Sequence, residues 1–107
     1  DEAGRRLLTL STGLTIKIGK ALDGKAEKEL NLKYLQGEYV PKLEKLIPAI
    51  RDAFIREVSA RTYSELLQPS VRQQILDDLK DRANNLLRSY GIEPRIVEIY
   101  GTMWHFS

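Results

Sequence analysis

The side chains that could carry out catalysis or bind a metal ion are few in this sequence. His105 is the single histidine, and the 107 residues include no cysteine. One histidine without placed partners forms neither a metal site nor a Ser-His-Asp arrangement. The lack of cysteine excludes a thiol nucleophile, a thiolate zinc site and a disulfide. We therefore expect His105 to be an ordinary residue of the C-terminal segment.

One acidic cluster has the spacing of a possible cation site. Asp77, Asp78 and Asp81 span one turn of a predicted helix, and carboxylates placed in this way can hold a divalent cation. Lys80 and Arg82 alternate with them, which is typical of a solvent-exposed helix face. We interpret the cluster as such a face, and the sequence predicts no metal ion and no other cofactor.

Other site motifs are also missing from the chain. Ser59, Ser64 and Ser70 lack the glycines of a nucleophile elbow, and Gly19 and Gly24 do not form a phosphate-binding loop. A KH-type RNA-binding domain needs a G-x-x-G loop, which is absent, and the basic residues are spread over both halves of the chain. The sequence therefore argues against a hydrolase or metal enzyme, a small-molecule substrate and a nucleic-acid partner.

Length and composition fit a single globular domain over residues 1–107. The chain is 42% hydrophobic and 30% charged, and its net charge of +2 is too small to indicate nucleic acid or an acidic lipid surface as a partner. The pairs Arg51-Asp52 and Arg56-Glu57 are interpreted as solvent-exposed helix charges. No apolar run approaches the roughly 20 residues of a membrane helix. Because the chain opens at Asp1 without Met, we expect it to be a piece of a longer protein.

Residues 7–18 alternate along the chain, which predicts a single β-strand with one buried face. That face consists of Leu8, Leu10, Thr12, Leu14, Ile16 and Ile18. At about 3.3 Å per residue, a strand of this length spans roughly 40 Å. Gly19 and the turn-like Asp23-Gly24 end it, and residues 25–35 are predicted to form a short helix.

A second predicted helix begins after a break at Gly37 and has apolar residues three or four positions apart. These residues are Val40, Leu43, Ile47, Ile50, Phe54 and Val58. Pro48 lies inside the pattern, so we expect a bend near Ile47 unless the helix starts there. Thr62 and Glu65 have capping-box spacing, which predicts one further helical turn.

The longest predicted helix follows Pro69. Ser70 and Gln73 have capping-box spacing at its start, and Gly91 is placed to cap its end before Pro94. Its apolar face consists of Val71, Ile75, Leu79, Ala83 or Leu86, and Tyr90. At 1.5 Å per residue this helix is about 30 Å long and can lie along strands of similar length.

Residues 95–106 are rich in β-branched and aromatic side chains, which predicts a C-terminal strand. Both of its faces are apolar. One face carries Val97, Ile99 and Met103, and the other carries Ile96, Tyr100, Trp104 and Phe106. Either a bulge at Gly101 re-aims the second half of the strand, or something outside this chain covers one face.

The order of the elements predicts an α+β fold. We expect a two-layer domain in which long N-terminal and C-terminal β-strands pack against two or three α-helices. Two strands alone make a marginal sheet with unpaired backbone groups at its edges, so we infer either a further strand or pairing with a neighbouring subunit. The candidate protein-interaction residues are Tyr100, Met103, Trp104 and Phe106. For Tyr100 and Trp104, completion of the core is the alternative role.

Two segments follow a recognisable pattern. Pro48–Asp52 has the form P-x-[IL]-R-[DN] on a predicted helix, and Val58–Leu66 has the form L-S-x-[KR]-T-x-x-[ED]-L, with Val in place of the first Leu. Gln68–Val71 follows as a turn without its usual glycine, Asn84–Leu87 ends a helix, and Val97–Phe106 is the last strand. In this order of elements the chain resembles the periplasmic domain of the flagellar basal-body protein family FliL.

The resemblance implies a bacterial inner-membrane protein with a short cytoplasmic N-terminus and one membrane helix before Asp1. The domain is then expected on the periplasmic side, at the flagellar basal body. The family's domain looks like those of stomatin and prohibitin proteins, which assemble into rings.

FliL-like proteins associate with the flagellar stator and favour its active state in motility and chemotaxis. The implied function is therefore non-enzymatic, with further copies of the same chain and the stator proteins as partners. A ring-building scaffold domain of another envelope or secretion machine is the alternative function.

Overall fold

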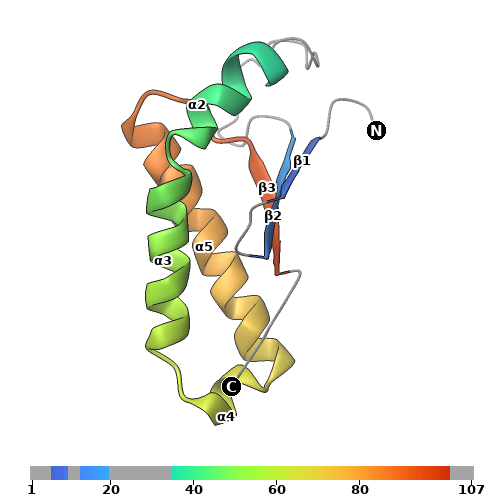
Figure 1. Ribbon diagram of the computed structural model, residues 1–107, viewed down its shortest axis with the longest axis vertical. Helices are drawn as coiled ribbons and strands as arrows, with labels where there is room; N and C mark the ends of the chain where they lie inside the picture. Colours follow the sequence, from blue (N-terminus) through green and yellow to red (C-terminus); the bar gives the residue numbers. More distant parts are fainter. Residues whose placement is uncertain (1–5, 10–12, 20–34, 102–107) are drawn as a thin grey trace.

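The structure is a computed structural model, and it describes residues 6–9, 13–19 and 35–101. These residues form an α+β fold with two layers, an antiparallel sheet and the helices packed on one side of it, as Figure 1 shows. The predicted fold class is confirmed. The helix predicted over residues 25–35 falls outside the described residues, apart from Leu35.

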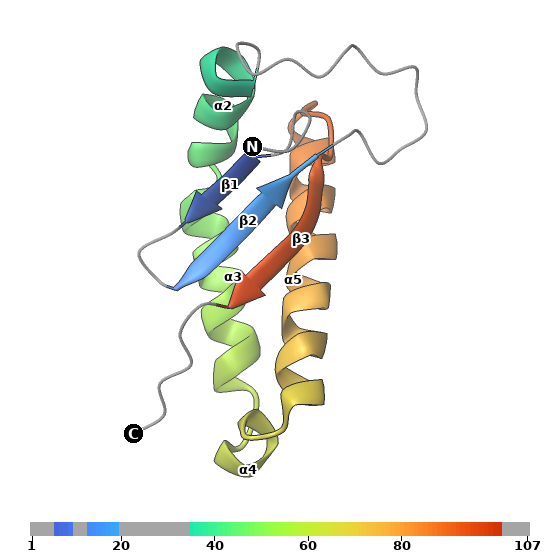
Figure 2. The same ribbon diagram turned by 90° about the vertical axis from the view of Figure 1, so that its right-hand side faces the viewer.

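The sheet has three strands in the order β1-β2-β3. They are β1 (Arg6–Thr9), β2 (Leu14–Ile18) and β3 (Ile96–Gly101). The helical elements between β2 and β3 are η1 (Leu35–Tyr39), α2 (Val40–Glu44), α3 (Ile47–Ser59), α4 (Tyr63–Leu66) and α5 (Pro69–Ser89). In Figure 2 the sheet lies in front of α3 and α5, with β1 on the side of α3 and β3 in front of α5.

The alternating N-terminal segment is a β-hairpin, so the prediction of one twelve-residue strand is wrong. β1 and β2 pair antiparallel, with Leu8 opposite Ile16 and Thr9 opposite Thr15. In this register, even-numbered residues pair with even-numbered ones, so the even-numbered residues of both strands lie on the same face of the sheet. The sequence therefore alternates as it would in one long strand. Gly13, with a φ of 84°, adopts the left-handed conformation that the turn requires. The hairpin supplies the third strand.

From Glu98 to Gly101, β3 keeps its register with β2, and the residues that a bulge at Gly101 would re-aim lie outside the described part of the chain. The irregularity lies earlier in β3. Ile18 lies opposite Ile96, whereas the residue before Ile18 lies opposite Glu98, so Val97 is the extra residue. The bulge lets β3 keep pairing with β2 although its alternation is imperfect.

The long amphipathic pattern divides into two helices where the sequence predicts a bend. α2 ends at Glu44 and α3 starts at Ile47. Pro48 therefore lies in the first turn of α3, where its missing N–H removes no helical hydrogen bond. The predicted break at Gly37 is wrong, because this residue lies within η1, a π-helical turn that continues into α2.

α5 differs from its prediction at both ends. Its N-cap is Gln68 and Pro69 fits the first helical position, so the capping box predicted at Ser70 does not form. The prediction that Tyr90 lies on the apolar face is wrong, because Tyr90 follows the last helical residue and is 65% exposed. Gly91 ends the helix as predicted, with a φ of 71°.

One apolar core lies between the sheet and the helices. Its most deeply buried members include the large aliphatic residues Leu14, Ile16, Ile18, Leu43, Ile50, Leu79, Leu87, Ile96 and Ile99. Burial of each such side chain contributes about 1.5–3 kcal/mol to folding. The even-numbered residues of β2 are all buried, so the alternation predicts this face correctly.

Within the described residues, α5 is longer than the strand that it covers, so the predicted match in length does not hold there. The 21 residues of α5 span about 32 Å, whereas the six residues of β3 span about 20 Å. Figure 2 shows that the far ends of α3 and α5, with α4 between them, extend beyond the sheet. The second patterned segment, which runs from the end of α3 through α4, lies on this extension.

Candidate functional site

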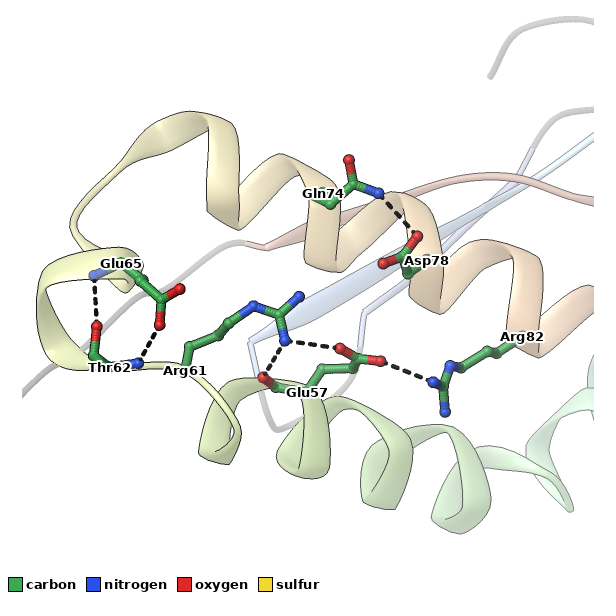
Figure 3. Close-up of polar contacts among 7 residues, drawn as sticks. All are labelled: Glu57, Arg61, Thr62, Glu65, Gln74, Asp78 and Arg82. Atoms are coloured by element: carbon green, nitrogen blue, oxygen red, sulfur yellow. Dashed lines mark hydrogen bonds and ion pairs between the residues drawn. The ribbon is translucent and has the colours of Figure 1, made fainter.

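The two patterned segments lie on α3, on the corner after it and on α4. Pro48–Asp52 belongs to the first half of α3, and Val58–Leu66 runs from the last residues of α3 to the end of α4. We call residues 48–66 the motif segment. Figure 3 shows the polar side chains that hold its corner together and join it to α5.

Glu57 connects α3, the corner and α5 through one carboxylate. Arg61 Nη1 donates to the main-chain oxygen of Glu57 at 3.3 Å and to Oε2 at 3.2 Å. Arg82 Nη2 of α5 lies 3.0 Å from Oε1 of the same carboxylate (Figure 3). The Glu57 side chain is only 12% exposed, so its interpretation as a solvent-exposed charge is wrong. These bonds fix the position of the corner against α5.

Thr62 and Glu65 form the predicted capping box of α4. Glu65 Oε1 accepts a hydrogen bond from the Thr62 backbone N–H at 2.8 Å, and Thr62 Oγ1 accepts one from the Glu65 backbone N–H at 3.2 Å. Hydrogen bonding to Thr62 lowers the pKa of the Glu65 carboxyl. The Thr62 backbone N–H contributes most, and the Thr62 side chain contributes next. The box reverses the chain between α3 and α5 and satisfies two N–H groups at the start of α4.

The end of α4 is fixed from α5. Leu66 is buried, and Arg72 Nη1 donates to the main-chain oxygen of Leu66 at 3.1 Å. A carbonyl group at a helix end has no partner within the helix, so the guanidinium supplies the missing bond. The second half of the motif segment therefore forms a corner that is braced on α5.

Arg51 differs from Arg61 in that no acceptor among the described residues binds its Nε. Its side chain is half-buried, and Nε is shielded from solvent without a hydrogen-bond partner among the described residues. A buried donor without an acceptor costs about 1–3 kcal/mol. Ile55 lies one turn further along the same face of α3 and is 52% exposed. The stability of the fold therefore does not explain why an unsatisfied donor of Arg51 and an exposed Ile55 lie side by side on α3.

The acidic cluster of α5 is hydrogen-bonded along its own helix. Gln73 Nε2 donates to Asp77 Oδ1 and Gln74 Nε2 donates to Asp78 Oδ1, both at 2.9 Å. Asp81 is exposed. Within residues 6–9, 13–19 and 35–101, no group of three or more acidic, histidine or cysteine side chains could hold a metal ion.

One of the four predicted interaction residues, Tyr100, lies in the described part of the chain. The other three, Met103, Trp104 and Phe106, fall outside it, as does His105. Ile99 is buried in the core, and successive strand residues alternate, so Tyr100 lies on the face of the sheet turned away from the helices. It is 36% exposed, and its hydroxyl donates to Glu98 Oε1 at 3.0 Å.

A hollow of about 420 Å³ lies where the loop after α5 meets α2. Its lining residues are Lys42, Lys45, Leu46, Tyr90, Gly91 and Ile92. Among the described residues, this lining contains two lysines, a tyrosine and apolar groups, and it includes no carboxylate and no imidazole.

The comparison with family models identifies the chain. The model of the flagellar basal body-associated protein FliL matches residues 1–104. The chain belongs to the FliL family. The match covers the hairpin as well as the motif segment, so it extends beyond the patterns that the sequence alone reveals. No curated protein and no solved structure matches the chain.

Membership makes this FliL-family chain an accessory protein of the flagellar basal body. In the described part of the chain, no helix is long and apolar enough to cross a membrane. The site that the structure offers is a set of surfaces on α3, α4 and β3, and their groups suit contact with other proteins.

Sequence reasoning misses three residues of these surfaces. Glu57 and Arg61 are four positions apart, and this spacing on a helix could have predicted their ion pair. The contact of Glu57 with Arg82 depends on how α3 packs against α5, and no local pattern encodes it. Likewise, the lack of an acceptor for Arg51 Nε among the described residues can be recognised only from the folded structure.

Proposed function

We propose that this FliL-family domain is a non-enzymatic subunit of a homo-oligomer, arranged as a ring, that binds the flagellar stator and supports its active state. The observation that carries the proposal is the small sheet, in which β1 and β3 are the two outer strands among those that the structure describes. Edge strands carry unpaired backbone groups, which further chains can pair with or cover. A ring places each subunit between two others.

Exposed apolar side chains support protein contacts on several sides of the domain. They are Ile55, Tyr63, Leu67, Tyr90 and Tyr100, each at least 36% exposed. Large aromatic and aliphatic side chains of this kind are common in protein interfaces, and Tyr is enriched among the residues that dominate binding energy. One surface for the next copy and another for the stator are therefore available.

The proposal includes a location. We place the domain on the periplasmic side of the bacterial inner membrane, tethered by a membrane helix that precedes Asp1. In cells, protease added to spheroplasts should digest a domain of the full-length protein that faces the periplasm. Protection of the domain under conditions where a periplasmic control protein is digested would contradict this location.

The decisive experiment is crosslinking in motile cells. A photoreactive amino acid at Tyr100 or Tyr63 of the full-length protein should give adducts with the same protein and with a stator protein, both identified by mass spectrometry. Deletion of the gene should reduce swimming or swarming. Absence of every stator adduct from these positions would remove the stator from the proposal, and absence of self-adducts would remove the oligomer.

A further inference from the structure

Two charged groups on different sides of the domain can complement each other between copies. We propose that Arg51 and Ile55 of α3 in one copy dock against Glu98 and Tyr100 of β3 in the next copy. This inference rests on the proposed function, because it assigns an interface to the proposed oligomer. The occupant of both surfaces is a second copy of this chain.

The first surface is centred on the guanidinium of Arg51. Arg51 Nε has no acceptor among the described residues, and the side chain makes no ion pair with them. The guanidinium can therefore turn toward an incoming carboxylate without breaking a hydrogen bond of its own subunit. Ile55, 52% exposed on the same face, supplies apolar area beside the charge. A complementary surface would place a carboxylate against the guanidinium of Arg51 and an aromatic ring against Ile55.

The second surface offers that combination. Glu98 and Tyr100 alternate onto the outer face of β3, and the Tyr100 hydroxyl donates to Glu98 Oε1 at 3.0 Å. This bond fixes one carboxylate oxygen and leaves the other able to accept from a guanidinium. Lys17 lies opposite Glu98 in the register of β2 and β3, so it shares this face. A charge reversal at Glu98 places two cations opposite each other within the subunit, so the folding of that variant has to be checked.

The two surfaces lie on different sides of the subunit. Figure 2 shows α3 on the β1 side, whereas β3 is the opposite edge strand, in front of α5. A contact between unlike surfaces is heterologous, and each copy then has one surface of each kind left to bind again. Repetition of such a contact closes into a ring when the rotation between copies permits it. Arg51 with Glu98 thus fits the assembly that the proposed function requires.

Paired cysteines test the contact, because the 107 residues contain no cysteine of their own. The full-length protein carrying Ile55→Cys and Tyr100→Cys, treated in cells with a short bismaleimide, should give a ladder of covalent multimers. Either single variant should not give a ladder, because a head-to-tail bond needs both surfaces. The matched control combines Leu67→Cys with Tyr100→Cys, since Leu67 is 50% exposed but lies after α4.

Charge exchange tests the pairing itself. Arg51→Glu and Glu98→Arg should each reduce the ladder by at least about tenfold, because each places like charges against each other. The double variant Arg51→Glu with Glu98→Arg should restore it. Circular dichroism of each variant checks that the helices remain, so a loss through unfolding is recognised.

Three outcomes would overturn the inference. In the first, Leu67→Cys with Tyr100→Cys gives as much ladder as Ile55→Cys with Tyr100→Cys. In the second, Arg51→Glu and Glu98→Arg do not reduce the ladder. In the third, the double charge variant gives as little ladder as either single variant. If an amine-reactive crosslinker still joins copies in any of these cases, the oligomer stands and only this interface is wrong. If it joins none, the oligomer of the proposed function fails as well.

Discussion

The side-chain amide of Asn84 pairs with both backbone polar groups of Ile96. Asn84 Nδ2 donates to the Ile96 main-chain oxygen at 2.8 Å, and the Ile96 N–H donates to Asn84 Oδ1 at 3.1 Å. Both residues are buried, with Asn84 only 3% exposed. α5 therefore takes the place of a neighbouring strand at the start of β3, and this part of the edge is closed by the fold itself.

Replacing Asn84 with Ala should destabilise the domain by about 2–4 kcal/mol, because it leaves two buried backbone groups without partners. Urea unfolding followed by circular dichroism measures the loss. Asn85→Ala is the matched control, since Asn85 is exposed and its Oδ1 accepts only from Arg88 of the same helix among the hydrogen bonds described. Its effect should stay within about 0.5 kcal/mol. Equal losses in the two variants would show that the amide pairing with Ile96 contributes little.

The bridge from α3 to α5 should be measurable as a coupling between Glu57 and Arg82. Glu57→Gln and Arg82→Gln should each destabilise the domain by about 0.5–1.5 kcal/mol, because the carboxylate is mostly shielded while the arginine is more than half exposed. In a double-mutant cycle the two losses should not add, since each variant already removes the same ion pair. Additive losses would place the two residues in separate roles.

Glu65 should make the domain less stable in acid. Its pKa is lowered in the folded protein, chiefly by the hydrogen bond from the Thr62 backbone N–H. The stabilisation is therefore fully present above the ordinary value of 4.5 and is lost as pH falls through the lower folded value. Glu65→Gln keeps the acceptor but not the charge, so its urea midpoint should fall below wild type at pH 7 and approach wild type once the pH is below the lowered pKa of Glu65. A difference independent of pH would exclude the carboxylate as the cause.

Two glycines should respond to the same substitution with opposite signs. Gly91 has a φ of 71°, so Gly91→Ala should destabilise the domain by about 1 kcal/mol. Gly37 lies in η1 with no atom within 4 Å of an added Cβ, so Gly37→Ala should stabilise it by about 0.5–1 kcal/mol. Thermal unfolding of both variants under one set of conditions provides the comparison. Effects of the same sign would contradict the backbone conformation at one of the two positions.

The features that sequence reasoning predicts correctly depend on residues close together in the chain. Thr62 and Glu65 form their capping box within one turn, and Gly91 caps α5 next to the helix it ends. The features that it misses depend on register or on packing. The hairpin keeps the parity of its residues through the turn at Gly13, so alternation cannot distinguish it from one strand.

The bulge and the helix bridge show the same limit. The bulge at Val97 is set by how β3 pairs with β2, and Glu57 meets Arg82 only because α3 and α5 are neighbours. At the candidate surfaces, the aromatic density of the last strand indicates Tyr100, but nothing local distinguishes Arg51 from the paired arginines. Contacts between elements distant in sequence therefore set the limit of prediction.

The contact between Gly19 and Val97 explains why β2 is followed by glycine. Gly19 donates its N–H to the Arg95 main-chain oxygen at 2.8 Å, and a Cβ at this position would lie 2.9 Å from Val97 Cγ1. The bulge holds Val97 against the backbone, and a β-branched side chain has little rotamer freedom to move away. A larger residue at position 19 must therefore displace either the strand end or the bulge.

Gly19→Ala should accordingly destabilise the domain by about 1–3 kcal/mol through overpacking. Val97→Ala removes the methyl groups that clash, so Gly19→Ala should cost clearly less in a Val97→Ala background than in the wild-type background, by about 1 kcal/mol. Urea unfolding gives the free energy of unfolding of the wild type, the two single variants and the double variant, which together form the cycle. Equal costs of Gly19→Ala in both backgrounds would show that the backbone at position 19, rather than the Val97 side chain, requires glycine.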